Sequence, residues 1–156
     1  MRQYRKSQVN GKPRTRALSA DIVSPDHRSK IMSMIKGKNT RPEMVVRSVC
    51  HEIGLRYRLH RKDLPGKPDL VFPKYRLCLF VHGCFWHRHP DCKYAYTPKS
   101  RLDFWLPKLA KNVERDADAL QALHARRWRV AIIWECHTKN RELLRTEIRK
   151  IFGLSA

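Results

Sequence analysis

Two nearly uninterrupted apolar runs, at residues 76–81 and 129–134, constrain the fold of this chain more than any other feature. Runs without regular polar alternation are typical of strands that are covered on both faces of a sheet. An amphipathic stretch lies between the two runs, and another follows at residues 141–152. Strands that alternate with helices predict an α/β fold, a single domain with a mixed central sheet flanked by helices.

Shorter signals predict the elements that precede the first run. Thr40 and Glu43 have the spacing of a capping box, and the helix that they begin should end at Gly54. Short strands are expected at residues 55–60 and 69–72, each bounded by residues that favour turns. The expected order is therefore a helix, three strands, a helix, a strand and a final helix.

One more helix is expected, and the long helix of this order has a predicted start. A short one is predicted at residues 28–36, and Pro107 is predicted to open the long helix before the last strand. The apolar positions that give this long helix its spacing are Leu109, Val113, Ala117, Leu120 and Leu123.

The composition indicates one packed domain that binds a polyanion. The chain has 156 residues, is 42% hydrophobic and carries a formal net charge of +20. Residues 1–20 contain six basic residues and no acidic one, so residues 1–24 are expected to be a disordered basic arm before a domain at residues 25–156. The other 28 basic residues still outnumber the 14 acidic ones, which favours nucleic acid as the partner. A merely soluble cationic surface is the alternative.

Cysteines and histidines cluster where the two buried strands end. Cys84, His89 and Cys92 follow the first strand, and Cys136 lies two residues beyond the second. Neighbouring strand ends can converge, which would complete a tetrahedral set of three cysteines and one histidine for structural Zn²⁺. His87 competes with His89 as the third ligand, and ordinary buried thiols with solvated histidines are the alternative to a metal site.

A carboxylate beside the cluster suggests hydrolysis of a phosphodiester. Asp69 follows Pro68 at the start of a strand, and the next strand ends near His82. Restriction-endonuclease-like nucleases place a Pro-Asp pair on one strand and an acid-x-Lys motif on its neighbour. Here Phe80 and His82 stand at the acid and lysine positions, so the motif is degenerate. Asp69 could hold Mg²⁺, and an aspartate that only caps a turn is the alternative.

Taken together, these residues resemble the very short patch repair (Vsr) endonucleases of bacteria, which act at T:G mismatches. The resemblance runs from about residue 28 to residue 136 and is carried above all by the hexapeptide His-Gly-Cys-Phe-Trp-His at residues 82–87. Further matches are Leu-Pro-Gly-Lys-Pro-Asp at 64–69, Phe-Trp-Leu at 104–106, Lys-Asn-Val-Glu-Arg-Asp at 111–116 and Trp-Glu-Cys at 134–136. The resemblance implies a restriction-endonuclease-like fold, structural Zn²⁺, and Mg²⁺-dependent nicking on the 5′ side of the mismatched thymine.

The resemblance also assigns roles in the catalytic site. It places Mg²⁺ on Asp69 and on the backbone carbonyl of Val81, with Glu43 and His82 contacting the metal site through water. His87 matches a histidine beside the scissile phosphate. Glu43 has a competing explanation, because the capping box already uses its carboxylate.

DNA contacts are assigned to six residues. Intercalating aromatic rings separate base steps at the cost of unstacking, and a T:G wobble is a weakened step. Trp105 could equally be a core residue. The resemblance gives the following assignments: Phe85, Trp86 and Trp105 intercalate, Met32 approaches from the other groove, and Lys67 and Asn112 bind DNA.

Two other classes of protein fit parts of the pattern. One is a restriction-type or homing-type nuclease that cuts intact duplex, and the other is a zinc module that binds DNA without cleaving it. With no apolar stretch of membrane-spanning length, a cytoplasmic, nucleoid-associated monomer is expected.

Overall fold

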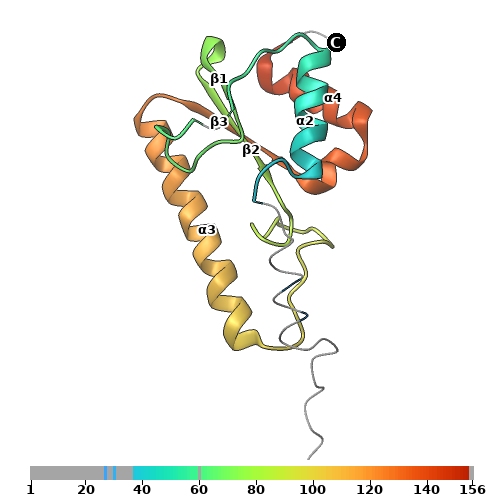
Figure 1. Ribbon diagram of the computed structural model, residues 1–156, viewed down its shortest axis with the longest axis vertical. Helices are drawn as coiled ribbons and strands as arrows, with labels where there is room; N and C mark the ends of the chain where they lie inside the picture. The colour runs from blue at the N-terminus through green and yellow to red at the C-terminus, as the bar shows by residue number, and fades with distance from the viewer. Residues whose placement is uncertain (1–26, 28–29, 31–36, 60, 155–156) are drawn as a thin grey trace, which may run out of the picture.

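The computed structural model describes residues 27, 30, 37–59 and 61–154 (Figure 1). The predicted arm at residues 1–24 and Met32 lie outside the described residues, as does most of the predicted helix at 28–36. The main elements, in chain order, are α2 (Arg41–Glu52), β1 (Leu70–Phe72), β2 (Leu77–His82), α3 (Leu102–Ala125), β3 (Arg129–Trp134) and α4 (Arg141–Phe152), with 3₁₀ turns η1 (Pro73–Tyr75) and η2 (Glu135–Lys139).

The sheet is mixed, and β2 is its central strand. β1 pairs antiparallel to β2, and β3 pairs parallel to it from Leu77 beside Arg129 to His82 beside Trp134. The predicted α/β architecture with a mixed sheet is confirmed. Because β2 and β3 are parallel and in register, the loop after His82 and the turn η2 leave the sheet at the same edge.

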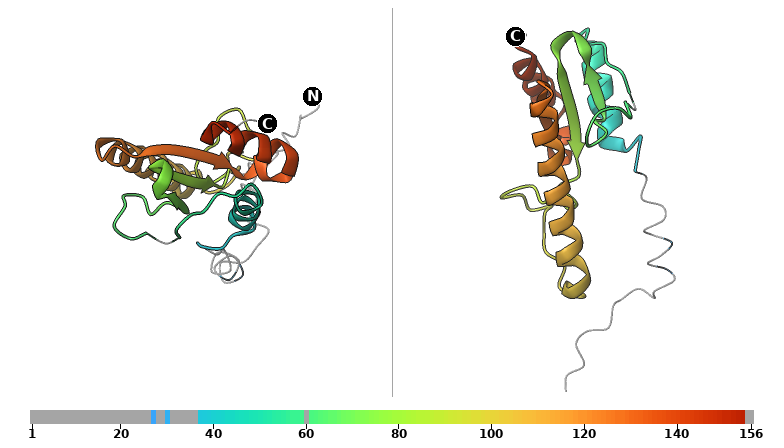
Figure 2. Two further views of the ribbon diagram at one scale, coloured as in Figure 1. Left: turned by 90° about the horizontal axis from the view of Figure 1, so that it is seen from above. Right: turned by 90° about the vertical axis from the view of Figure 1, so that its left-hand side faces the viewer.

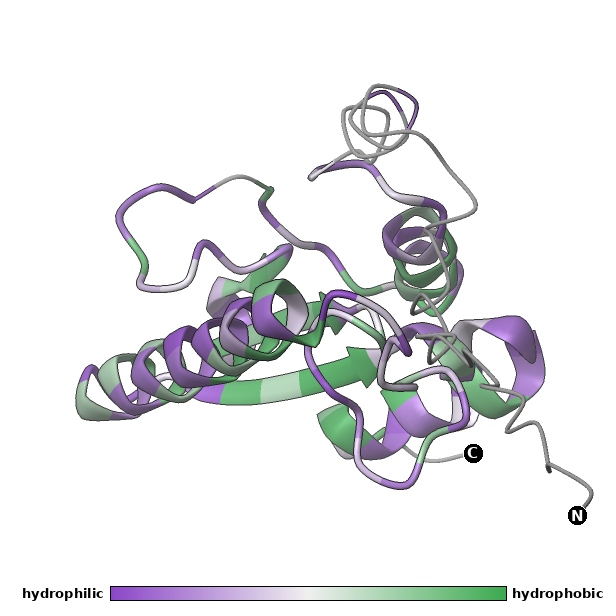
Figure 3. Ribbon diagram, turned by 90° about the horizontal axis from the view of Figure 1, so that it is seen from below, coloured by the Kyte–Doolittle hydropathy of each residue, from purple (hydrophilic) through white to green (hydrophobic). Residues whose placement is uncertain are grey.

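Helices cover both faces of the sheet, as expected for its apolar strands. Along β2, Leu77 and Leu79 pack in the cluster that contains residues of α2 and α4, whereas Cys78 and Phe80 pack in the cluster that contains Leu123 of α3. Figures 1 and 2 show α3 on one side of the strands and the pair α2 and α4 together on the other. The strands are mostly hydrophobic along their length, whereas the helices alternate between hydrophobic and hydrophilic residues (Figure 3).

The capping box predicted for α2 is present. The Thr40 side chain accepts a hydrogen bond from the backbone N–H of Glu43, whose side chain accepts one from the Thr40 backbone. The strand predicted at residues 55–60 is wrong for the described part of that segment, where only Arg58 forms an isolated bridge to Val71. Since β1 has only three residues, it offers little backbone for a fourth strand to pair with.

Helix α3 begins five residues before Pro107, so the predicted start is wrong. Pro107 lies inside the helix, where it removes the single hydrogen bond that its N–H would give to Asp103. The predicted apolar stripe is correct at Leu109 and Leu123, which are buried, but Val113 is 43% exposed. Apolar residues are not buried in the middle of α3, because polar side chains occupy the side of the helix that faces the pocket described below.

Candidate active site and metal centre

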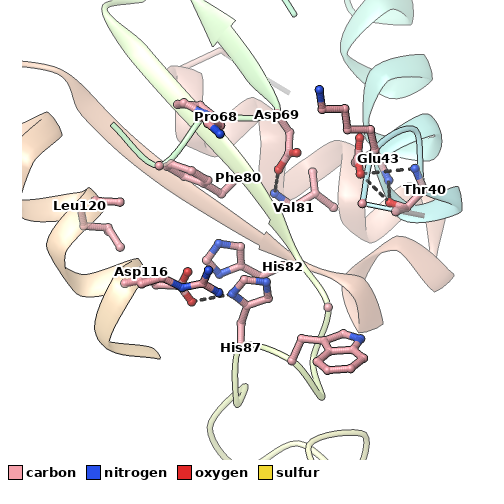
Figure 4. A pocket seen from close by; sticks show the side chains of 18 of the residues that line it. Thr40, Glu43, Pro68, Asp69, Phe80, Val81, His82, His87, Asp116 and Leu120 are labelled. Carbon is pink, nitrogen blue, oxygen red and sulfur yellow. Dashed lines mark hydrogen bonds and ion pairs between the residues drawn. The ribbon is translucent and has the colours of Figure 1, made fainter. Parts of the chain in front are cut away.

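A pocket of about 650 Å³ lies where β2 ends, between α2 and α3 (Figure 4). Its lining includes three acidic side chains, Glu43, Asp69 and Asp116. It also includes six cationic ones, Lys38, Arg47, Arg61, Lys62, Lys67 and Arg115. An excess of cations around a few carboxylates suits a ligand that carries phosphates and a divalent cation.

Asp69 lies just before β1 and is fixed against the central strand. Its Oδ2 accepts a hydrogen bond of 2.7 Å from the backbone N–H of Val81. Burial raises the pKa of Asp69 to about 6, and the charge of Glu43 adds to the increase, whereas the Val81 N–H and Arg47 oppose it. A bound divalent cation would favour the charged carboxylate, so this donor set fits Mg²⁺.

Gly66 is the backbone feature that lets this aspartate approach the strand. Its φ is +70°, and a Cβ atom there would lie 2.6 Å from the Cβ of Ala119 on α3 and 3.1 Å from the Phe80 ring. Only glycine fits between these neighbours with this backbone conformation. The turn at Gly66 therefore packs tightly against α3, and this packing places Asp69 in the pocket.

Glu43 lines the pocket and also caps α2. Its Oε1 accepts hydrogen bonds from the Thr40 hydroxyl at 2.8 Å and the Thr40 N–H at 3.3 Å, and its Oε2 accepts from Asn39 N–H at 3.0 Å and Arg47 at 2.9 Å. The side chain is buried. Glu43 is thus beside Asp69 with its carboxylate already held by protein donors.

His82 and His87 stack on each other below Asp69 in the view of Figure 4. Their ring centroids are 3.9 Å apart and the rings are nearly parallel, at 13°. Burial lowers the pKa of His82 to about 4, and His87 adds to the decrease, so His82 is neutral near pH 7. His87 Nδ1 lies 2.5 Å from Oδ2 of Asp116 on α3, which leaves Nε2 as the ring nitrogen not engaged by this carboxylate.

The predicted zinc ligands lie together at the same edge of the sheet. The ligand atoms of Cys84, His89, Cys92 and Cys136 are all within 4.8 Å of one another. Nδ1 of His89 is 3.7 Å from the Cys84 sulfur and 3.4 Å from the Cys136 sulfur. Burial and the neighbouring Cys84 raise the pKa of Cys136 to about 12. Thiols this close ionise together only around a cation, so the set fits Zn²⁺.

The two candidate histidines for the third ligand occupy different places. His89 lies with the three cysteines and stacks on Trp134, with ring centroids 4.2 Å apart. His87 instead contacts Asp116 and His82 in the pocket. The geometry therefore favours His89 as the metal ligand.

Aromatic side chains gather between the metal cluster and the start of α3. Phe85 lies edge-on to Trp86 and Trp105, with centroid distances of 5.1 and 5.6 Å. Nζ of Lys108 lies 5.5 Å from the Trp86 ring centroid and 5.8 Å from that of Trp105. Phe85 and Trp86 are half-buried, but Trp105 is only 8% exposed and supports them from below the surface.

The remaining predicted DNA contacts lie near these rings and the pocket. Lys67 is exposed on the pocket rim, with φ at +52°. Nδ2 of Asn112, one turn of α3 beyond Lys108, donates a hydrogen bond of 3.2 Å to the Trp86 backbone carbonyl. Asn112 thus fixes the loop that carries the aromatic rings.

Asp116 and Arg47 are pocket residues for which the sequence suggested no role of their own. A signal for Asp116 exists in the sequence, because Trp105, Leu109, Asn112, Asp116 and Leu123 share one helical face. Two polar residues on the face that α3 turns toward the sheet indicate a functional surface. Arg47 gave no comparable signal, because a cation in a helix is usually solvated.

Comparison with known proteins identifies the family. The family model for the DNA mismatch endonuclease Vsr matches residues 20–94. The DNA mismatch endonuclease Vsr of Escherichia coli is 42% identical over 128 residues, which cover 82% of this chain and 81% of that protein. The chain belongs to the Vsr family of DNA mismatch endonucleases. The type II nicking enzyme V.XorIIP of Xanthomonas oryzae is 53% identical over 86% of this chain and 98% of that enzyme.

Membership in the Vsr family makes the protein a DNA endonuclease, which rules out a DNA-binding module without catalysis. A solved structure agrees on the fold: the catalytic domain of the homing endonuclease I-Bth0305I superposes with a TM-score of 0.52 and 21% identity, covering 74% of this chain and 96% of that domain. The restriction-endonuclease-like fold is therefore confirmed. No helix among the described residues is long and apolar enough to cross a membrane.

Proposed function

We propose that this Vsr-family endonuclease nicks one strand of duplex DNA on the 5′ side of the thymine in a T:G mismatch. The observation that supports this most is the pocket itself, where Asp69 lies between Glu43 and the stacked His82 and His87 within a cationic lining. Cations would bind the phosphates on either side of the scissile bond, and the carboxylate suits a catalytic Mg²⁺.

Asp69 and the backbone carbonyl of Val81 would hold the Mg²⁺. When bound, this ion stabilises negative charge on the phosphate and lowers the pKa of water. Glu43 and His82 line the same pocket and would contact the metal's water shell. Neutral His82 adds no repulsion to a cation, which suits this position.

His87 and Asp116 would act together at the scissile phosphate. The contact of Nδ1 with the Asp116 carboxylate holds the imidazole ring in one orientation. The other nitrogen, Nε2, is the ring atom left to contact the DNA beside the scissile phosphate. The metal cluster of Cys84, His89, Cys92 and Cys136 would carry structural Zn²⁺ that holds the loop bearing His87.

Mismatch recognition would fall to the aromatic rings beside the pocket. Phe85 and Trp86 are half-buried and therefore accessible enough to stack on bases. Buried Trp105 would support these two rings, and Met32 would approach from the other groove. Lys67 and Asn112 would position the duplex around them. Because a T:G wobble stacks less well than a Watson–Crick pair, the cost of unstacking is lower at the mismatch.

Replacing both Phe85 and Trp86 with alanine should remove most of the discrimination between T:G and matched duplexes. Each base–aromatic stack is worth about 1–3 kcal/mol, so the preference should fall by about 10- to 1000-fold. Affinity titrations of both duplexes at two salt concentrations measure this. Tyr94→Ala, which removes an exposed ring outside the aromatic group, is the matched control. Equal losses on the two duplexes would show that the rings only pack the loop.

A plasmid assay separates nicking from the alternative of double-strand cleavage by a restriction-type or homing-type nuclease. A monomer with one catalytic site should convert a supercoiled plasmid containing a single T:G mismatch into the open circle and stop there. If linear plasmid accumulates as fast as the open circle forms, the alternative of double-strand cleavage is supported. The expected setting is the nucleoid in the bacterial cytoplasm, where DNA with such mismatches occurs.

A further inference from the structure

Arg47 is the buried cation of the active-site pocket. Of the six cationic side chains that line the pocket in the described part of the chain, it alone is buried, at 7% exposed. One terminal nitrogen donates to Oδ1 of Asn39 at 2.6 Å, and the other donates to Oε2 of Glu43 at 2.9 Å. The Nε atom is buried without a partner among the described residues.

These contacts close a ring of hydrogen bonds around the Glu43 carboxylate. The backbone N–H of Asn39 donates to the same Oε2 that Arg47 binds, while the Asn39 side chain accepts from Arg47. Asn39 has φ at +55°, a left-handed conformation that asparagine adopts more readily than most residues. The ring thus fixes both the carboxylate and the segment at residues 37–40, part of which lines the pocket.

We propose that Arg47 is a positioning residue of the active site, which holds Glu43 and the wall of the pocket formed by residues 37–43 in place. Figure 4 shows Glu43 and Thr40 on one side of Asp69, with His87 and Asp116 on the other. Arg47 thereby sets the distance between the two sides across which Mg²⁺ and the scissile phosphate are held. This inference rests on the proposed function.

A simple helix-stabilising ion pair is a poorer explanation of the same contacts. The first turn of α2 already has its capping box, and an exposed pair at i and i+4 would give similar support without desolvating an arginine. Burial of Nε without a partner carries a cost that a purely structural side chain such as methionine would avoid. Strain and unpaired polar atoms of this kind concentrate at functional sites.

The Arg47→Met variant of the full chain tests the proposal in two ways. Hydrogen exchange at the amides of Asn39 and Thr40, both donors to Glu43, should accelerate by at least about tenfold while exchange in the sheet is unchanged. The Mg²⁺ concentration that gives half the maximal single-turnover nicking rate should rise by about tenfold. Arg56→Met removes an exposed arginine that lies just after the same helix and outside the pocket, and it should change neither readout by more than about twofold.

A double-mutant cycle with Glu43→Gln separates positioning from folding. If Arg47 acts through Glu43, the double variant should nick no more slowly than Glu43→Gln alone. If Arg47→Met alone unfolds, the double variant should fold again, because both buried charges have been removed. If the rate losses of the two single variants multiply in the double variant, the proposal is overturned. It is also overturned if Arg47→Met folds and keeps the Mg²⁺ dependence and amide exchange of the unaltered protein. If the unaltered chain fails to nick T:G duplex, the proposed function fails, and the exchange experiment still decides whether Arg47 holds the wall.

Discussion

Replacing Asp69 with asparagine should abolish nicking while binding to T:G duplex remains measurable. Asparagine keeps the size of the side chain and an oxygen that can accept the Val81 N–H, but it loses the negative charge that would hold Mg²⁺. Loss of several kcal/mol of transition-state stabilisation corresponds to a rate decrease of about 1000-fold or more. Single-turnover nicking with Mg²⁺, and mobility shifts without it, measure the two effects separately.

Asp118→Asn is the matched control for this charge change, because Asp118 is an exposed acid on α3. It should nick at a rate within about twofold of the unaltered protein. Near-normal cleavage by Asp69→Asn in Mg²⁺ would remove Asp69 from the catalytic mechanism.

Loss of any of the four proposed zinc ligands should unfold the edge of the sheet that carries the candidate active site. We expect one tightly bound zinc per chain, and Cys136→Ala should release it and lower the free energy of unfolding by several kcal/mol, because structural zinc contributes folding free energy directly. Elemental analysis and denaturant unfolding measure the two quantities. Cys50→Ala, which alters a buried thiol outside the cluster, should keep its zinc.

The two histidines give a sharper form of the same test. His89→Ala should lose zinc, whereas His87→Ala should keep zinc and lose nicking, because only His89 lies with the three cysteines. Freshly purified protein without zinc would contradict the structural-metal interpretation altogether. The reverse pattern in the two histidine variants would exchange their roles.

The elements that were predictable from the sequence are those with local physical signals. The apolar runs identified β2 and β3, and the Thr40 capping box identified the start of α2, because burial on two faces and helix capping both leave a pattern within a few residues. The start of α3 was misjudged because Pro107 was read as the first residue of the helix, whereas it lies inside the helix, five residues after its start.

Contacts between distant segments could not be predicted in this way. Asp116 contacts His87 across 29 positions of the chain, which depends on how α3 packs against the sheet. Cys136 contacts His89 across 47 positions, which depends on the parallel register of β2 and β3. The cysteine cluster was nevertheless anticipated, because its members follow two strand ends that share an edge. Arg47 was not, because nothing in its neighbourhood in the sequence shows that a helix surface will face a pocket.

Cleavage of two duplexes that differ in one base tests the central claim most directly. One 5′-labelled duplex carries a T:G mismatch and the other carries C:G at the same position, both with Mg²⁺ under single-turnover conditions and with Asp69→Asn as the inactive control. We predict a single nick on the thymine strand, immediately 5′ to the mismatched thymine, in the first duplex and no nick in the second. Equal cleavage of both duplexes, or cleavage of both strands, would contradict the account.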